Sequence, residues 1–339
     1  MSRLNIPLGQ SSRQGGSGKF LVFFLMLAAG GGGVWWWRKN HAPPPPPAVA
    51  VAPVVQPVAP PPAPVDPLVK AGLKHASVRI NGPLEAALVE SAGREIGPAL
   101  AQVVTRALVW WVDVPGDFRK GDALDVLYEE RAGQEPLVHA VRFESSKMAK
   151  SFRAYRFQPK GDPFARYYQP SGEEMEMRLR PSPLDDYEQV TSLIRDGRRH
   201  KGVDFKTPVG TPVKSTLAGV ITRKNWNWRS NGNCLEVSEA GGRKKALFLH
   251  LAELPKSVKV GDRVVVGQTI AQSGNSGHSF APHLHYQLMA GEERVLDPFE
   301  THGSYRRSVA VEAKSALDVE VKRLDGLMDG AAGSTLATK

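Results

Sequence analysis

The sequence predicts a mainly β protein, in which an antiparallel β domain at residues 185–300 follows a small α+β domain at 77–184 and an N-terminal transmembrane helix. Three observations support this architecture. Glycine and proline interrupt residues 200–300 about every eight to twelve residues, which is typical of short antiparallel strands. Helical spacing followed by strand-like alternation marks the preceding region. An uncharged run near the N-terminus is long enough to cross a bilayer.

The N-terminal segment is expected to anchor the chain in a membrane after a cytoplasmic stretch at residues 1–19. Residues 20–37 are uncharged, and as a helix they would extend for about 27 Å, close to the thickness of the hydrocarbon core. Basic residues flank the run on both sides, so the positive-inside rule favours a cytoplasmic N-terminus only weakly. Three tryptophans at 35–37 suit the far interface, and no small-residue cleavage site follows promptly. An uncleaved anchor is therefore favoured over a cleaved signal peptide.

A proline-rich linker is expected at residues 38–76. Its central part, PPPPPAVAVAPVVQPVAPPPAPVDP, has no regular apolar period and holds nearly half of the 27 prolines. Such a composition favours an extended polyproline spacer over a packed domain. The linker would hold the globular part of the chain away from the membrane.

The α+β domain at 77–184 begins with two segments of helical apolar spacing, PLEAALVESAG and GPALAQVVTRALVWWV. The segments ALDVLYEE, VHAVRFES and KSFRAYRF then alternate as strands do. The polar residues of this domain show no catalytic or ligand-like spacing. We therefore interpret His75 and His139 as ordinary surface or hydrogen-bonded residues.

The tail at residues 301–339 contains SALDVEVKRLDGLMDG, which predicts a short amphipathic helix. The apolar face of that helix is expected to pack on the β domain. No function is assigned to the tail.

Composition limits the kinds of partner and site. The formal net charge of +10 and the pI of about 9.7 favour an acidic partner, such as nucleic acid, an anionic membrane surface or an anionic wall polymer. Charge alone does not choose among them. The single cysteine, Cys234, excludes an internal disulfide and a cysteine-rich zinc finger, and its strand-like surroundings predict a small buried side chain.

Histidines cluster in the β domain, which contains His200, His250, His278, His283 and His285. Alternate side chains of a strand share a face, so the two histidines of FAPHLHYQL point to one spot. In HKGVD, the glycine and the β-branched valine favour an extended segment in which His200 and Asp204 also share a face.

A third strand-like segment, KALFLHL, carries an isolated histidine. Strict alternation would place Ala246, Phe248 and His250 on one face and the three leucines on the other. Three strands would then each present polar side chains to one cleft.

Two histidines and one aspartate would form a metal site with nitrogen and oxygen ligands. Such a set suits Zn²⁺ with water in an open fourth position. The metal would lower the pKa of that water and polarise a carbonyl group. Two further histidines would be available for proton transfer or oxyanion stabilisation.

The motifs HKGVDF, LFLHL and SGNSGHSFAPHLHYQL resemble those of the lysostaphin-type (LytM) zinc metallopeptidases, the M-twenty-three peptidase family of cell-wall endopeptidases. The upstream segments ALVWWVDVPGDFRKGDALDVLYEE, KSFRAYRF and RPSPLD resemble the companion domain of bacterial murein DD-endopeptidases in that family. The resemblance covers about residues 77–300. It implies that residues 185–300 form a LytM-type antiparallel β-sheet peptidase domain.

The resemblance also implies a role for each motif residue. His200, Asp204 and His285 match the zinc ligands, while His250 and His283 match the residues that flank the reacting groups. The implied activity is hydrolysis of amide bonds in peptidoglycan stem peptides or cross-links during cell-wall remodelling. Peptidoglycan, rather than nucleic acid, is then the expected acidic partner.

The resemblance further implies a place in the cell and a form of control. The chain would lie in the bacterial cell envelope, anchored in the inner membrane with its catalytic domain in the periplasm. Companion domains of this kind can cover the cleft, so the domain at 77–184 is expected to be autoinhibitory. A chain that begins near Asp186 would then be more active.

Two departures from the family pattern affect the cleft. The long loop with a Phe-Gly-x-Arg and His-Pro pattern that usually precedes the first ligand is missing, so one wall of the cleft is shortened or rebuilt. Before PHLH, Ala281 replaces the usual glycine and Phe280 occupies the place of the usual threonine.

Two other functions stay open. The segment VKVGDRVVVGQTIAQSGNSG resembles the hairpins of biotinyl or lipoyl carriers, although no modified-lysine tripeptide such as MKM occurs. A non-catalytic LytM-type protein that binds the wall or activates an amidase is the second alternative, because a shortened cleft can bind without cutting.

Overall fold

The structure, a computed structural model, describes residues 66–194, 200–291 and 293–336. The expected anchor at 20–37, and the expected linker up to residue 65, lie outside this part of the chain. No helix among the described residues is both long enough and apolar enough to cross a membrane.

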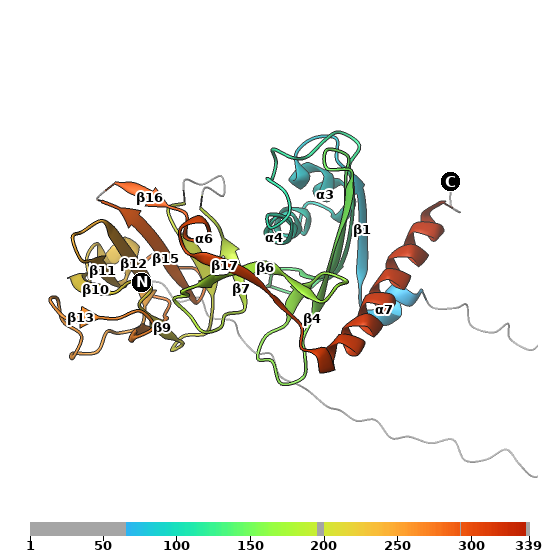
Figure 1. The fold of residues 1–339 in the computed structure, drawn as a ribbon. Helices are drawn as coiled ribbons and strands as arrows, with labels where there is room; N and C mark the ends of the chain where they lie inside the picture. The colour runs from blue at the N-terminus through green and yellow to red at the C-terminus, as the bar shows by residue number, and fades with distance from the viewer. Residues whose placement is uncertain (1–65, 195–199, 292, 337–339) are drawn as a thin grey trace, which may run out of the picture. The chain divides into compact units, whose positions relative to one another are not determined.

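The first sheet is antiparallel, and within the described residues it has seven strands in the order β1-β2-β3-β4-β5-β6-β17 (Figure 1). The strands are β1 (Lys74–Arg79), β2 (Ala123–Glu129), β3 (Leu137–Ser145), β4 (Lys150–Phe157), β5 (Arg166–Tyr168), β6 (Glu173–Arg180) and β17 (Gly303–Ser308). Strand β17 comes from the C-terminal part of the chain and pairs along β6, with Gly303 opposite Arg180. The sheet therefore contains strands from both ends of the described chain.

Helices cover both faces of this sheet. Helices α3 (Leu84–Ala92) and α4 (Gly97–Leu108) pack against the face that contains Val126. Helix α7 (Val311–Leu336) packs against the face that contains Leu127. Val126 and Leu127 are neighbours in β2, and successive side chains of a strand point to opposite faces. A short helix, α2 (Pro67–Ala71), precedes β1 and contacts α7.

The ends of this domain differ from the sequence-based expectation. Strand β1 begins at Lys74, so the boundary expected between residues 76 and 77 falls inside a strand. The prediction that the tail helix packs on the β domain is wrong. In α7, Leu317, Leu324 and Met328 are buried, and they pack against aromatic and aliphatic side chains of the first sheet. This sheet offers a second apolar face, which α7 covers.

The second sheet confirms the predicted antiparallel β domain. Its described strands have the order β13-β10-β11-β12-β15-β8-β7, and β16 pairs with β15 outside this path. Strands β9 and β14 form a separate pair. The bounds are β7 (Gln189–Ser192), β8 (Val203–Lys206), β9 (Pro212–Lys214), β10 (Gly219–Lys224), β11 (Asn233–Glu239), β12 (Lys244–Leu251), β13 (Arg263–Val264), β14 (Thr269–Gln272), β15 (His283–Ala290) and β16 (Arg294–Leu296), with short helices α5 (Trp228–Asn231) and α6 (Pro298–Thr301).

Strand β15 alternates between an apolar core face and a face that carries its histidines. Leu284, Tyr286 and Leu288 are completely buried in the core of the second sheet, together with Phe205 of β8 and Phe248 of β12. The intervening histidines of β15 therefore lie on the opposite face, as the alternation predicts. The core consequently determines which way the polar side chains point.

The packing of α7 leads to a stability prediction. Leu324→Ala should lower the free energy of unfolding by about 2–5 kcal/mol, because it leaves a cavity where a fully buried leucine packs. Urea denaturation followed by circular dichroism measures the change. Val319→Ala on the same helix is the control: this valine is 68% exposed, and its replacement should change stability by less than about 0.5 kcal/mol. Equal effects of the two substitutions would contradict the packing of α7 on the sheet.

Candidate metal centre

Strands β8 and β15 bring two of the predicted ligands together. In their antiparallel register, His285 lies directly opposite Asp204, and His283 lies opposite Lys206. Side chains at directly opposite positions share a face and stand about 5 Å apart at their Cβ atoms. The pairing of the two strands thus places the carboxylate of Asp204 beside the ring of His285.

Three side-chain atoms converge at this point. The distance from His285 Nδ1 to Asp204 Oδ1 is 2.8 Å, and from His200 Nε2 to His285 Nδ1 it is 3.1 Å. His200 Nε2 lies 3.3 Å from Asp204 Oδ1. All three atoms fall within 4.8 Å of one another, an arrangement that can hold a metal ion.

His200 is held by the end of β7. Its Nδ1 lies 3.1 Å from the carbonyl oxygen of Leu193 and 2.8 Å from Ser192 Oγ. Because a carbonyl oxygen only accepts, the contact with Leu193 places the proton of the imidazole on Nδ1. The other nitrogen, Nε2, then presents a lone pair to the cluster, as expected of a metal-binding histidine with a backbone partner.

The three candidate ligand atoms of the cluster, from His200, Asp204 and His285, are all electron-pair donors. Burial would raise the pKa of the Asp204 carboxyl, but the neighbouring imidazole rings of His200 and His285 hold this pKa well below its ordinary value. The carboxylate is therefore ionised at neutral pH. Ligands that surround a tetrahedral zinc ion at 2.0–2.1 Å stand roughly 3.3 Å from one another. The observed separations are 2.8, 3.1 and 3.3 Å, so the three atoms would move apart by up to about 0.5 Å to hold the ion.

Two further histidines lie beside the cluster. The ring centroids of His250 and His283 are 4.7 Å apart, and His283 Nε2 lies 3.9 Å from Asp204 Oδ1. Each ring is oriented by a backbone carbonyl: Nδ1 of His250 donates to Ser276 at 2.9 Å, and Nδ1 of His283 donates to Ala281 at 2.8 Å. In both rings Nε2 is thus the nitrogen that can accept a proton. Burial lowers the pKa of His250 to about 4, so its ring is neutral at pH 7.

His250 reaches this position by breaking the alternation of its strand. Phe248 faces the core opposite Tyr286, and strict alternation would place His250 on that core face as well. Instead, His250 has a φ of 61°, and the register of β12 with β11 shifts at the same place. This β-bulge turns His250 toward the cluster and returns Leu251 to the core. The predicted face of His250 was wrong, although its nearness to the other histidines was predicted.

Sequence reasoning missed the contribution of Gly202. A Cβ atom at this position would lie 2.6 Å from His285 Nε2 and 2.6 Å from the carbonyl oxygen of Tyr286. Only a residue without a side chain lets β8 approach β15 this closely. The glycine of HKGVD was visible in the sequence, but there it indicated only an extended segment.

The loop before β15 is fastened to the neighbouring strands. Ser276 Oγ donates to the carbonyl oxygen of Leu251 at 2.7 Å and accepts from the Asn233 N–H at 2.9 Å. The fifth histidine of the region, His278, is exposed and stands apart from the cluster, edge-on to Phe280 at 5.1 Å between ring centroids. The side chain of Phe280 is 92% exposed. Cys234 is buried, as predicted.

A cavity of about 510 Å³ lies next to the metal-site cluster. Asp204 forms part of its wall together with Thr191 of β7, and the facing wall includes Gln102 and Thr105 of α4. The companion domain therefore contributes residues to a space that borders the candidate ligands.

The profile of the family described as Peptidase family M23 matches residues 198–298, a range that includes all five side chains of the cluster and its surroundings. Among curated proteins, the chain is 29% identical over 213 residues to the peptidoglycan DD-endopeptidase ShyC of Vibrio cholerae, covering 59% of this chain and 47% of ShyC. It is 29% identical over 261 residues to ShyA of the same organism, and this match covers 73% of this chain and 58% of ShyA. Lysostaphin of Staphylococcus simulans is 43% identical over 94 residues, and this match covers 28% of this chain and 19% of lysostaphin. The chain thus spans about half the length of the Vibrio relatives and less of lysostaphin.

Solved structures give similar matches. A zinc-containing peptidase from Vibrio cholerae is 26% identical, with a TM-score of 0.31 and coverage of 67% of this chain and 69% of that chain. The catalytic domain of lysostaphin from Staphylococcus simulans is 34% identical, with a TM-score of 0.30 and coverage of 37% and 90%. Together with the family profile and the sequence relatives, the five side chains identify residues 198–298 as a domain of peptidase family M23.

Proposed function

We propose that the chain is a zinc metalloendopeptidase that hydrolyses amide bonds in the stem peptides or cross-links of peptidoglycan. The observation that carries the proposal is the convergence of His200 Nε2, Asp204 Oδ1 and His285 Nδ1. Two imidazoles and one carboxylate form the ligand set of a zinc site that keeps one position open for chemistry. Zinc bound there would supply a Lewis acid that polarises the scissile carbonyl and lowers the pKa of water.

The remaining histidines are proposed to serve proton transfer and orientation. The ring of His250 is neutral at pH 7, and its Nδ1–H is engaged by a backbone carbonyl, so its Nε2 can accept a proton. His283 is held in the same way and lies on the same strand face as His285. Once protonated, either ring can donate to a developing oxyanion or to a leaving amine.

The proposed substrate rests on the named relatives. ShyA, ShyB and ShyC are named peptidoglycan DD-endopeptidases, and a relative from Staphylococcus capitis is named a glycyl-glycine endopeptidase. All of these names describe cleavage between amino-acid residues, and the DD-endopeptidases act on peptidoglycan. The net charge of +10 agrees with a substrate that carries free carboxylates.

We also propose that the chain works in the bacterial envelope, anchored in the inner membrane by residues 20–37 with the peptidase domain in the periplasm. Support comes from the uncharged N-terminal run and the proline-rich spacer that follows it. Peptidoglycan lies on that side of the membrane, so the spacer would let the domain reach it.

Substitutions separate the proposed ligands from the proposed catalytic histidines. His285→Ala and Asp204→Ala should each lose bound zinc and the ability to digest purified sacculi, because each removes a ligand. His250→Ala and His283→Ala should keep close to one zinc per chain and lose about 10²- to 10⁴-fold in rate. Zinc content by mass spectrometry and release of peptide fragments are the two measurements.

His278→Ala is the matched control, because this histidine lies in the same region but apart from the cluster. It should keep both zinc and activity. An active enzyme with Ala at position 283, or a zinc-free variant that digests sacculi at the wild-type rate, would overturn these roles. A zinc-loaded wild-type protein that binds sacculi without cutting them would favour the alternative of a non-catalytic wall-binding protein or amidase activator.

Gly202 gives an independent test of the metal site. Gly202→Ala should displace His285 or the backbone of β15 and weaken zinc binding by about tenfold or more, because the new methyl group has no room. Competition with a chromogenic chelator measures zinc affinity. Gly82→Ala is the control, since a Cβ atom there meets nothing within 4 Å and its φ is ordinary. Zinc affinity that is unchanged by Gly202→Ala would show that the close approach does not position the ligand.

We further propose that the companion domain restrains activity by covering the site. The residues of α4 that line the 510 Å³ cavity stand across from β7 and Asp204, so they would obstruct a peptide that approaches Asp204 through this cavity. The simplest test of this restraint is a chain that begins near Asp186. Such a chain would lose Leu179 and Leu184, which are buried in the core of the second sheet. Its activity would report on misfolding as well as on inhibition.

A cross-link tests the restraint without deleting any residue. Gln102→Cys and Thr191→Cys place thiols on opposite walls of the cavity, and the buried Cys234 is shielded from reagent. Joining the pair with a bismaleimide should reduce sacculus digestion by about tenfold or more, because α4 is then held over the site. The two single variants, treated with the same reagent, are the controls. Undiminished activity of the cross-linked enzyme would contradict the covering role.

A further inference from the structure

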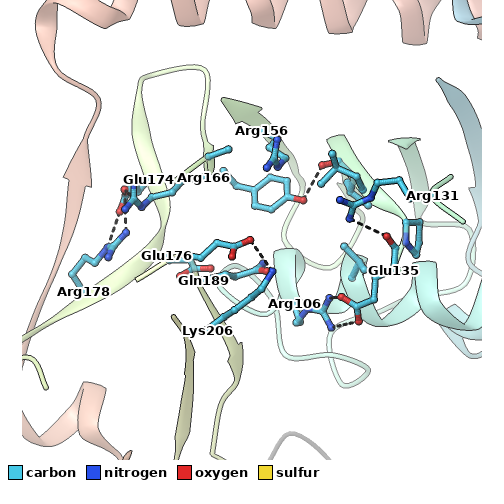
Figure 2. A pocket seen from close by; sticks show the side chains of 17 residues that line it. Arg106, Arg131, Glu135, Arg156, Arg166, Glu174, Glu176, Arg178, Gln189 and Lys206 are labelled. Carbon is cyan, nitrogen blue, oxygen red and sulfur yellow. Dashed lines mark hydrogen bonds and ion pairs between the residues drawn. The ribbon is translucent and has the colours of Figure 1, made fainter. Parts of the chain in front are cut away.

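The wall of a second cavity, of about 110 Å³, contains neither the three proposed ligands nor His250 and His283. Its walls come from α4, from strands β3 to β6 of the first sheet, and from β7 and β8 of the second (Figure 2). A single water needs only about 10–15 Å³ measured in this way. The cavity therefore has room for several waters or for a small polyatomic ion.

Basic side chains outnumber ionised acids around this cavity. The basic side chains in the wall are Arg106, Arg131, Arg156, Arg166, Arg178 and Lys206. The carboxyl groups in the wall are those of Glu135, Glu174, Glu176 and Glu188. Burial raises the pKa of Glu176 to about 8, so this group is mostly protonated at pH 7. Among the side chains that line the cavity, basic groups therefore outnumber ionised carboxylates near neutral pH.

Much of the positive charge in the wall is paired. Arg106 forms two hydrogen bonds with Glu135, at 2.7 and 3.2 Å, and Arg178 donates to Glu174 at 2.9 Å. The remaining basic groups with acidic partners are Arg166, which lies 2.6 Å from Asp186, and Lys206, which lies 2.8 Å from Glu188.

Two arginines of the wall have no such partner. In the part of the chain that the structure describes, neither Arg131 nor Arg156 has a carboxylate oxygen within 4.0 Å. Arg131 donates only to the backbone carbonyl oxygen of Glu135, at 3.0 Å. Figure 2 shows both arginines on the first-sheet side of the cavity. Their charges are available to a bound anion.

Buried hydrogen-bond donors without a partner among the described residues also favour a bound anion in this cavity. The Nε–H groups of Arg106, Arg131 and Arg166 are buried and form no hydrogen bond with the described residues, although Arg166 Nε lies 3.5 Å from Glu174 Oε1. All three arginines line this one cavity. Buried donors in folded proteins are nearly always satisfied by protein, water or an ion. Two such donors without an acidic contact in the described part of the chain, Arg106 Nε and Arg131 Nε, line one cationic space and indicate a ligand that supplies acceptor oxygens.

We propose that this cavity binds a small oxyanion, of the size of sulfate, phosphate or a single carboxylate group. Guanidinium groups recognise such ligands through paired, charge-assisted hydrogen bonds. A bound oxyanion would join α4 and β3 of the first sheet to β7 and β8 of the second, because all four elements contribute to the wall. Strand β7 leads directly into Leu193, whose carbonyl oxygen orients His200. A bound anion that stabilises β7 would therefore help to hold His200 in place.

Titration calorimetry on the zinc-loaded full chain tests the proposal, with sulfate, phosphate and acetate as separate probes. At least one probe should bind saturably at one site per chain, and the strongest probe identifies the oxyanion class. Arg131→Gln and Arg156→Gln should each weaken this binding by about tenfold or more, because each removes a charge-assisted hydrogen bond. Arg94→Gln, on an exposed arginine outside the cavity, should leave the affinity unchanged.

Three results would overturn the proposal. These are the absence of saturable binding for every probe, an equal loss in the Arg94→Gln control, and binding that survives both cavity substitutions but disappears in His285→Ala. The last result would place the anion on the metal. Melting temperatures of all variants confirm folding, and since binding is measured without substrate, the test is independent of peptidase activity.

Discussion

The register of β8 against β15 is the constraint on which the metal site depends. It sets Asp204 opposite His285, and a shift of one residue would turn the whole polar face of β15 into the core. The apolar side chains of β15 prevent such a shift, because Leu284, Tyr286 and Leu288 are fully buried on the other face. The metal site is thus positioned by hydrophobic packing on the reverse side of the same strand.

A β-bulge in β12 brings His250 to the site that the regular strands β8 and β15 form. His250 joins the cluster only because β12 bulges there, in a backbone conformation that costs a non-glycine residue about 1–3 kcal/mol. The strain is tolerated because Leu251 returns to the core and the ring donates to the carbonyl of Ser276. Ser276 in turn is held by Leu251 and Asn233, so the bulge and the loop before β15 support each other.

The sequence predicts the site residues better than it predicts how they meet. Spacing alone grouped His200, Asp204, His283 and His285, since period-two alternation is local and each motif is short. The face of His250 was wrong because alternation cannot anticipate a bulge. The role of Gly202 needs the distance between two strands that lie about 80 residues apart in the chain. The tail helix was placed on the wrong sheet, because an amphipathic pattern shows that a face is buried but not which surface covers it.

The connection between the two sheets follows from the return of β17. The chain leaves the first sheet through β6 and comes back as β17, and these two strands pair with each other. Arg307 of β17 reinforces the pairing by donating to the buried Glu174 of β6 at 2.7 Å. Any motion that uncovers the cavity beside Asp204 must therefore carry β6 and β17 together, along with the helix α7 that follows. The contacts of α4 with β7 would be among those that such a motion breaks, whereas the pairing of β6 with β17 would stay intact.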